Sequence, residues 1–254
     1  MTRQVTSDGN KYMKRIYRQS FDGDLQMVTV AVKETDLAIC LPAGIWTPQL
    51  AKQAVTLIKD LRQQLELYLS TDPEFLVSHQ PCEVKPHAPP IALAMSQAAR
   101  QANVGPMATV AGVFSQAMGQ FLSDYSSEVI VENGGDIYLQ STQERLVGIF
   151  AGTSPFNEKL ALRVRSAQCP VGICTSSGMV GHSFSYGKAD AAVIIASDTL
   201  LADAVATATA NLVQTAADVA KAAEFAMQIK NIIAAVVIKD EKIAAAGDTE
   251  LVPL

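Results

Sequence analysis

The residues of this chain best suited to chemistry lie between Val171 and Asn211, where an acid and a hydroxyl residue fall four positions apart. Asp203 and Thr207 belong to an Ala-rich stretch that is typical of a helix from about Asp198 to Leu212. A spacing of four places both oxygens on one helix face, and hard oxygen ligands suit Mg²⁺, which also binds water and phosphate oxygens. Residues 197–199 are the candidate N-cap, which would leave the first amides of the helix as donors for an anion. The pattern indicates a site for a cation and a phosphate, and a solvated acid with Thr207 as a packing residue is the alternative.

A hydroxyl-rich segment precedes this helix, and we expect it to form a turn. Its hydroxyls and backbone amides suit a phosphate or a ribose, whereas a serine-rich turn that satisfies its own backbone is the alternative. His182 follows the segment and is a candidate acid or base near neutral pH, or a hydrogen-bonding residue of the fold. The candidate binding residues of the segment are Thr175, Ser176, Ser177 and Gly178.

Two glycines and an acid lie between apolar segments that we expect to be strands. The dipeptide Asn133-Gly134 favours a tight hairpin turn. Two successive glycines also allow a flat ligand to approach the backbone closely. Gly134, Gly135 and Asp136 are therefore candidate ligand-binding residues, with a plain turn as the alternative.

The cysteines and histidines point to neither a disulfide scaffold nor a zinc site. Four cysteines in 254 residues are too sparse for a disulfide framework, and we expect them to be reduced. The three histidines have no metal-binding spacing, so a zinc enzyme is not expected. Cys174 directly precedes the hydroxyl-rich segment, and it is either an inert packing thiol or a thiol beside the candidate site.

The positions of apolar residues predict alternating groups of strands and helices. Thr47 and Pro48 mark the start of a long amphipathic helix. Five prolines between Ser70 and Pro90 oppose both helix and central strand, so this stretch is expected to be a connector or a cover. Predicted helices span residues 47–69, 91–101, 107–122, 198–212 and 216–228. Predicted strands span residues 12–18, 25–32, 36–40, 128–140, 146–151, 160–164, 189–196, 232–238 and 242–245.

This order of elements predicts an α+β fold with two successive strand-helix-strand units and mixed or antiparallel sheets. We expect a single domain over residues 1–254, with room for an internal two-unit division near residues 70–90. Small residues dominate Met107–Gly119 and Ala202–Ala226, which can pack within one chain or between copies, so a homo-oligomer is one option.

Composition narrows the classes of partner. Hydrophobic residues make up 49% of the chain and charged residues 18%, which is typical of a globular protein. The formal net charge of -5 gives no electrostatic reason to expect nucleic acid or an anionic membrane as a partner. No apolar run approaches the roughly 20 residues that span a bilayer, and no secretory signal is recognisable. We expect a cytoplasmic protein that acts on a small molecule, with no nucleic-acid and no membrane partner.

Three motifs in this order resemble the ApbE-like superfamily, which includes FAD:protein FMN transferases. They are Glu132-Asn133-Gly134-Gly135-Asp136-Ile137, Thr175-Ser176-Ser177-Gly178 and Ala202-Asp203-Ala204-Val205-Ala206-Thr207-Ala208. The resemblance covers residues 90–215 and is greatest to the compact, uncharacterised branch of the superfamily. It implies that Asp203 and Thr207 help to bind Mg²⁺ beside the pyrophosphate of FAD, and that Gly134, Gly135 and Asp136 line the flavin region.

The chain also departs from the transferase pattern. Transferases carry a His-x-x-Asp-Pro-x-Thr-Gly segment that is not recognisable between Met179 and Ser197. Their Lys-Gly-x-x-x-Asp feature corresponds here to residues 111–116, in which Ala111 and Gln116 replace the two charged residues. Because a lost charged contact in phosphoryl transfer costs a few kcal/mol, standard FMN transferase activity is not expected.

The preferred interpretation is a Mg²⁺-dependent enzyme that acts on a flavin nucleotide, FAD or FMN, or on another phosphate-bearing small molecule. His182 is the candidate proton shuttle in this interpretation. The alternative is a ligand-binding or assembly protein that kept the fold without the chemistry. A further alternative is a role in sulfur metabolism that uses Cys174.

Overall fold

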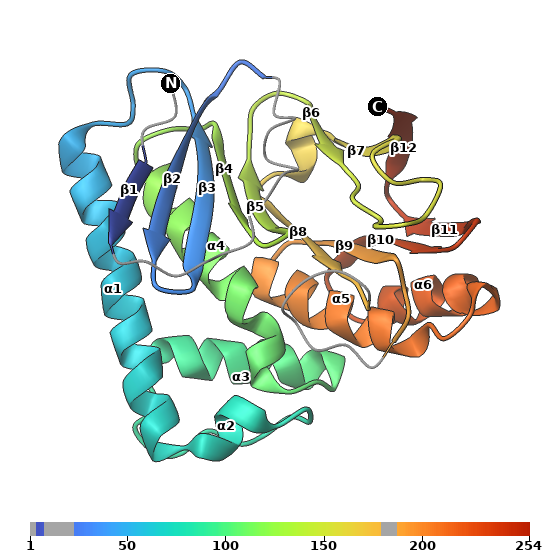
Figure 1. Ribbon diagram of the computed structural model, residues 1–254, viewed down its shortest axis with the longest axis horizontal. Coiled ribbons are helices and arrows are strands. Elements are labelled where there is room, and N and C mark those ends of the chain that lie inside the picture. Colours follow the sequence, from blue (N-terminus) through green and yellow to red (C-terminus); the bar gives the residue numbers. More distant parts are fainter. Residues whose placement is uncertain (1–3, 8–22, 179–186) are drawn as a thin grey trace.

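The computed structural model describes residues 4–7, 23–178 and 187–254. Helices cover one face of a large sheet, and a small sheet packs against the other face near the C-terminal strands (Figure 1). The predicted α+β class is confirmed, and the pairing is mixed, because β1 and β2 run parallel while the other paired strands run antiparallel.

In the described part of the chain the large sheet has the strand order β1-β2-β3-β4-β5-β8-β9-β10-β11 and the small sheet the order β12-β7-β6. The strands of the large sheet are β1 (Gln4–Ser7), β2 (Gln26–Val32), β3 (Thr35–Leu41), β4 (Val129–Asn133), β5 (Asp136–Gln140), β8 (Val171–Ser176), β9 (Ala191–Ala196), β10 (Ile232–Lys239) and β11 (Lys242–Gly247). Those of the small sheet are β6 (Arg145–Gly148), β7 (Leu160–Val164) and β12 (Glu250–Pro253).

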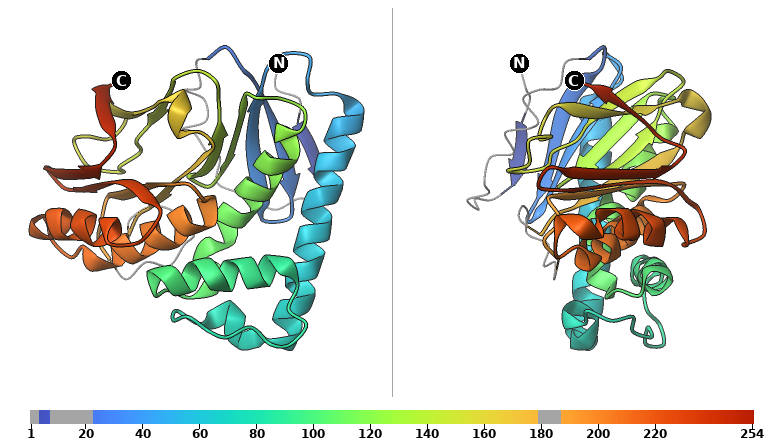
Figure 2. Two further views of the ribbon diagram at one scale, coloured as in Figure 1. Left: turned by 180° about the vertical axis from the view of Figure 1, so that it is seen from behind. Right: turned by 90° about the vertical axis from the view of Figure 1, so that its right-hand side faces the viewer.

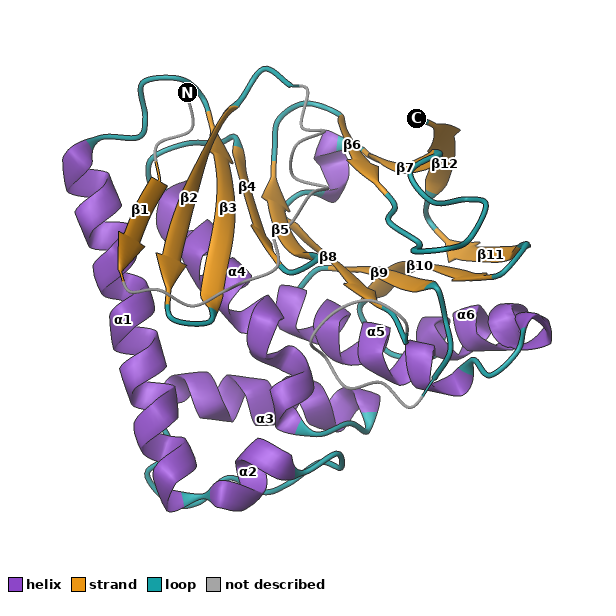
Figure 3. Cartoon of the chain, in the orientation of Figure 1, coloured by secondary structure: helices purple, strands orange, loops and turns teal. Residues whose placement is uncertain are grey.

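The helices lie mainly on the side of the large sheet away from the small one (Figure 2 and Figure 3). They are α1 (Pro48–Thr71), α2 (Pro73–Val77), α3 (Pro90–Ala102), α4 (Val110–Ser123), α5 (Thr199–Leu212) and α6 (Val219–Met227). Short 3₁₀ turns are η2 (Pro106–Thr109), η3 (Ser166–Gln168) and η4 (Ala216–Asp218). Among the described helices none combines the length and apolar character that a bilayer crossing requires.

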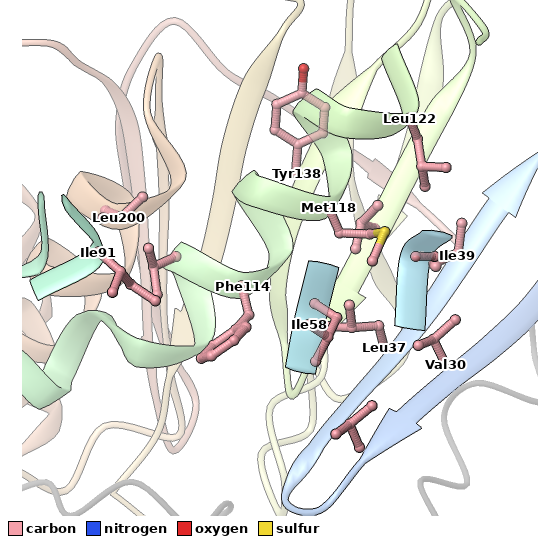
Figure 4. Close-up of a cluster of buried hydrophobic side chains, with 14 of the residues drawn as sticks. Val30, Leu37, Ile39, Ile58, Ile91, Phe114, Met118, Leu122, Tyr138 and Leu200 are labelled. Atoms are coloured by element: carbon pink, nitrogen blue, oxygen red, sulfur yellow. The ribbon is translucent and has the colours of Figure 1, made fainter. Parts of the chain in front are cut away.

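Helix α1 begins as the sequence predicts. The Thr47 side chain accepts a hydrogen bond from the backbone N–H of Leu50 at 3.2 Å, and Pro48 occupies the first helical position. One face of the helix is buried, and it includes Ile58, which packs in the core between α4 and strands β2 and β3 (Figure 4). The helix therefore covers the N-terminal half of the large sheet.

The proline-rich stretch after α1 contains a short helix that the sequence analysis did not predict. In α2, Pro73 lies in the first turn, where a missing N–H costs nothing. The stretch is fixed to α1 because Tyr68 donates a hydrogen bond to Asp72 at 2.8 Å and accepts one from the backbone N–H of Lys85 at 3.0 Å. The expected cover is thus tied down by a buried tyrosine.

The main correction concerns the hydroxyl-rich segment, which is not a turn over its whole length. Thr175 and Ser176 end strand β8, which pairs with β5 on one side and β9 on the other. A central strand rich in small and hydroxyl residues was misread because its flanking glycines and serines are typical of turns. The terminal strand β12 was also not predicted, and the predicted strand at residues 12–18 lies outside the described residues.

Candidate functional site

The candidate residues meet where the β4–β5 turn, strand β8 and helices α4 and α5 come together. Asp136 lies directly opposite Cys174 in the β5–β8 ladder. Helix α5 packs on β8 and α4, and it carries Asp203 and Thr207, both buried. The structure therefore brings together Asp136 and Asp203, which are 67 positions apart in sequence (203 minus 136).

The β4–β5 connection is the tight hairpin that the sequence predicts. Gly134 and Gly135 have φ angles of 70° and 106°, so both occupy the left-handed region that a type I′ turn requires. The N–H of Gly135 donates to the Glu132 carboxylate at 2.8 Å, and the Asn133 side chain donates to the carbonyl of Ala111 at 3.1 Å. The turn is thereby fixed to the start of α4, and Asp136 follows it as a buried acid.

Asp203 is a buried carboxylate with an acidic neighbour. Burial raises its pKa well above the usual range, the nearby Asp136 raises it further, and the hydrogen bond from the Gly112 backbone acts in the opposite direction. That bond joins the Gly112 nitrogen to Oδ2 of Asp203 at 2.8 Å. Two desolvated acids in one place favour a shared proton or a bound cation.

Gly112 brings α4 close enough to α5 for this hydrogen bond. It lies in the first turn of α4, where backbone N–H groups lack an acceptor within the helix. A Cβ atom at this position would lie 2.7 Å from the carbonyl oxygen of Thr199 and 2.9 Å from Cβ of Asp203. The site therefore depends on a glycine that the sequence marks only as the match to the glycine of the transferase Lys-Gly-x-x-x-Asp feature.

Cys174 lies beside the two acids, on the face of β8 that packs against α5. Its thiol is fully buried and donates to the carbonyl of Thr199 at 3.3 Å. Burial raises the pKa of this thiol well above its ordinary value, and Asp136 and Asp203 raise it further. A buried, protonated thiol is a poor nucleophile.

Much of the backbone of the hydroxyl-rich segment is already paired, contrary to the expectation of free amides. Thr175 and Ser176 belong to the β8–β9 ladder, and the N–H of Gly178 donates to the carbonyl of Ala189 at 3.0 Å. Ser176 is 7% exposed, and its hydroxyl has no hydrogen-bond partner within the described residues. What the segment offers a ligand is therefore chiefly its hydroxyls. His182 lies outside the described residues.

The N-terminus of α5 is also occupied, which corrects the expectation of an anion site there. Asp198 is the N-cap and accepts a hydrogen bond from the N–H of Leu201 at 2.9 Å. The Gln116 side chain accepts from the N–H of Thr199 at 2.7 Å and donates to Asp198 at 3.0 Å. An acidic cap repels anions. The N-cap predicted within residues 197–199 is confirmed as Asp198. Its contact with Gln116 could not be predicted from the sequence, because 82 positions separate the two (198 minus 116).

The donor set near Asp203 fits a hard divalent cation. Asp136, Asp203 and Thr207 offer only oxygen atoms, and Asp203 and Thr207 lie one helical turn apart on α5. Among the described residues, no three His, Cys, Asp or Glu side chains converge as a metal-ligand group. A cation here would need hydroxyl, carbonyl, water or phosphate oxygens as further ligands, and Mg²⁺ in proteins usually keeps several waters and binds substrate phosphates in this way.

The fold defines the class of protein. The apo structure of the flavinyl transferase ApbE of Pseudomonas stutzeri is similar, with a TM-score of 0.55 at 12% sequence identity, covering 89% of this chain and 95% of that one. The ApbE protein of Thermotoga maritima is similar with a TM-score of 0.53 at 10% identity, covering 84% and 94%. These likenesses show an ApbE-like fold.

Sequence comparison gives the family itself. A family model described as "AbpE bacteria" matches residues 18–245, and the chain belongs to this family. A UPF0280 protein of Methanococcus vannielii is 40% identical over 185 residues, covering 72% of this chain and 73% of the relative. A UPF0280 protein of Methanocaldococcus jannaschii is 36% identical over 201 residues, covering 77% and 82%. The predicted ApbE-like branch is thereby confirmed.

Proposed function

We propose that this protein is a Mg²⁺-dependent enzyme that acts on a flavin nucleotide or another phosphate-bearing small molecule. The observation that carries the proposal is the buried pair of acids, Asp136 and Asp203, beside Thr207. Two buried carboxylates close to one another are costly unless a proton or a cation compensates them. The structural relatives named as flavin transferases favour a flavin nucleotide as the ligand.

The residues of the site would divide the work as follows. Asp203 and Thr207 would hold the cation, and the Gly112 amide fixes one carboxylate oxygen and thereby orients the other. Gly134 and Gly135 would let the ligand approach the turn closely. When bound, Mg²⁺ would hold phosphate oxygens and offset charge that develops on them.

The paired backbone around the site has a consequence for phosphate binding. Because the amides of Gly178, Thr199 and Leu201 are already hydrogen-bonded, they are not available to cradle an anion. Phosphate recognition would therefore depend chiefly on the cation and on hydroxyls such as that of Ser176. We expect ligand binding to be strongly dependent on Mg²⁺.

Calorimetric titration with FAD and FMN, with Mg²⁺ or with EDTA, tests the proposal. We expect the wild type to bind in the presence of Mg²⁺. For Asp203→Asn we expect an affinity lower by about tenfold or more, and a tenfold loss corresponds to about 1.4 kcal/mol. The matched control is Asp124→Asn, an exposed acid at the end of α4, which should bind like the wild type. Absence of binding by the wild type, or an unchanged affinity in Asp203→Asn, would refute the proposal.

A second candidate function is ligand binding without turnover. It is favoured by the residues that replace the charged pair of the transferases, since Gln116 is engaged with α5 and the carbonyl of Ala111 with Asn133. In this case FAD would bind stoichiometrically and remain intact. Mass spectrometry of the nucleotide after prolonged incubation with Mg²⁺ distinguishes the two, because any accumulating cleavage product excludes the binding-only function.

The structure gives the sulfur-metabolism alternative little support. The Cys174 thiol is buried and its pKa is raised, so it lacks the thiolate character of a reactive cysteine. Cys174→Ser should leave any sulfur-transfer activity unchanged. Loss of such an activity in this variant would revive the alternative.

A further inference from the structure

Helices α4 and α5 are joined by two sets of hydrogen bonds, one turn apart on each helix. At one level the Gly112 N–H donates to Asp203, and at the next level Gln116 contacts Asp198 and Thr199. From one level to the next, the residue numbers rise on α4 and fall on α5, so the two helices run antiparallel here. We call these two sets of contacts the clamp. The first turn of α5 is therefore fixed at the same time as the carboxylate that follows it by one turn.

The Gln116 side chain uses both ends of its amide. Its Oε1 accepts the N–H of Thr199 at 2.7 Å, and its Nε2 donates to Oδ2 of Asp198 at 3.0 Å. The other oxygen of Asp198 accepts from the N–H of Leu201 at 2.9 Å. Only a side chain with an adjacent donor and acceptor can make both contacts, which distinguishes glutamine from the acid that the transferase pattern carries at this position.

From this geometry we infer that Gln116 is a positioning residue, which sets the rotation and axial position of α5 so that Asp203 meets Gly112 beside Asp136. The functional consequence rests on the proposed cation site at Asp203. Strand β8 supports the same turn from the other side, because Gly172 lies against the backbone of Thr199 and Cys174 donates to its carbonyl. With α5 held between α4 and β8, a change at Gln116 is transmitted to Asp203.

A donor–acceptor exchange separates this role from general packing. Gln116→Glu keeps an acceptor for Thr199 but sets a carboxylate oxygen against the Asp198 carboxylate, where a donor stood at 3.0 Å. Adding Asp198→Asn supplies a new donor on the opposite side and keeps an oxygen for Leu201, because asparagine is also a good N-cap. The two substitutions are each disruptive alone and complementary together.

The experiment compares the wild type, both single variants and the double variant by two readouts. The first is hydrogen exchange at the Gly112 amide, measured by NMR without any ligand. The second is the affinity for FMN in the presence of Mg²⁺. We expect each single variant to speed exchange and weaken binding by about tenfold, and the double variant to restore both to near the wild-type values.

Tyr68→Phe is the control for lost stability, because it removes a buried hydrogen bond from Tyr68 on α1 to Asp72, the residue that follows this helix, away from the site. It should lower Tm and leave both readouts unchanged. Single variants that leave the exchange at Gly112 at the wild-type value, single variants that leave the affinity unchanged although the wild type binds FMN, or a double variant that restores Tm without restoring the readouts would overturn the role of Gln116. If the wild type binds no flavin nucleotide while the exchange at Gly112 still responds, the proposed function fails and the clamp stands.

Discussion

Glu128 and Asp203 are both buried carboxylates, and each is 9% exposed, yet their surroundings shift their pKa values in opposite directions. Burial alone raises the pKa of Glu128, but hydrogen bonds from Arg145, Ser141 and Thr142 outweigh it and lower the pKa to about 2. At Asp203, burial and the neighbouring acid Asp136 raise the pKa, and a single backbone donor opposes them. The larger number of donors at Glu128 and the deeper burial of the Asp203 carboxylate together separate the two pKa values.

The hydrogen-bond partners of Glu128 and Asp203 also indicate different roles for the two carboxylates. Arg145 donates to Glu128 at 2.7 Å and also contacts Asp24, so this network ties the start of β6 and the residue before β4 to the segment just before β2. Among the described residues, Asp203 accepts a hydrogen bond from the Gly112 amide alone, and it lies beside Asp136. A carboxylate with its lone pairs filled stabilises the fold, whereas one with capacity left beside a second acid is suited to a cation.

The largest expected effect is the loss of the Glu128 network. Glu128→Ala removes the partner of a largely buried guanidinium and takes away the acceptor of the Thr142 hydroxyl and one of the two acceptors of the Ser141 hydroxyl. We expect the free energy of unfolding to fall by about 3 to 5 kcal/mol, as measured by urea denaturation. The control Glu224→Ala, an exposed position on α6, should change it by less than about 0.5 kcal/mol. An equal loss of stability in Glu128→Ala and Glu224→Ala would contradict the role of the Glu128 network in stabilising the fold.

Lowering the pH should weaken the contribution of Glu128 to stability and strengthen that of Asp203. The pKa of Glu128 is lower in the folded chain, at about 2 against 4.5, so its contribution is present above pH 4.5 and is lost as the pH falls toward 2. That loss amounts to about 3 kcal/mol. In Glu128→Gln the stability should fall less steeply over this range. Identical pH profiles for the wild type and this variant would contradict the lowered pKa.

A smaller effect is expected from a substitution that fills the space between α4 and α5 with a larger side chain. Gly112→Ala places a Cβ 2.7 Å from the Thr199 carbonyl oxygen, so the helices must separate. We expect a loss of about 1 to 3 kcal/mol in stability together with weaker Mg²⁺-dependent ligand binding. Gly119→Ala is the matched control on the same helix, since its Cβ meets the Tyr138 ring instead. It should destabilise the protein without altering ligand binding, and equal losses of binding in both would contradict a specific role for Gly112.

The sequence predicted those features that short-range patterns encode. Thr47 and Pro48 predict the start of α1, and Asn133-Gly134 predicts the β4–β5 hairpin, because both depend on neighbouring residues. The donor to Asp203 could not be predicted in this way, since Gly112 lies 91 positions away and only the packing of α4 on α5 unites them. For β8, local composition was misleading, because a strand buried on both faces needs no alternation of polar and apolar residues. The acids of the site were therefore predicted correctly as candidates, while their environment came from tertiary structure.

The smallest effect, and the one that separates the two carboxylates most sharply, is a gain in stability from Asp203→Asn without metal. Because the pKa of Asp203 is raised by burial and by Asp136, its stabilising contribution is present at low pH and is lost as the pH rises above its ordinary value of 3.8. Asparagine keeps an oxygen for the Gly112 N–H and removes the charge. In EDTA at neutral pH the variant should be more stable than the wild type by about 1 kcal/mol, or about 2 to 4 °C in Tm.

Measuring the stability of the wild type and Asp203→Asn at pH 4 and in Mg²⁺ shows whether the gain comes from the removed charge. The advantage of Asp203→Asn should shrink at pH 4, where the wild-type carboxyl keeps its proton, and it should also shrink in Mg²⁺, which stabilises only the chain that binds it. A variant that is less stable than the wild type in EDTA at neutral pH would mean that Asp203, like Glu128, serves the fold. Stability would then have been the reason for burying this acid, and the case for a cation between Asp136 and Asp203 would be lost.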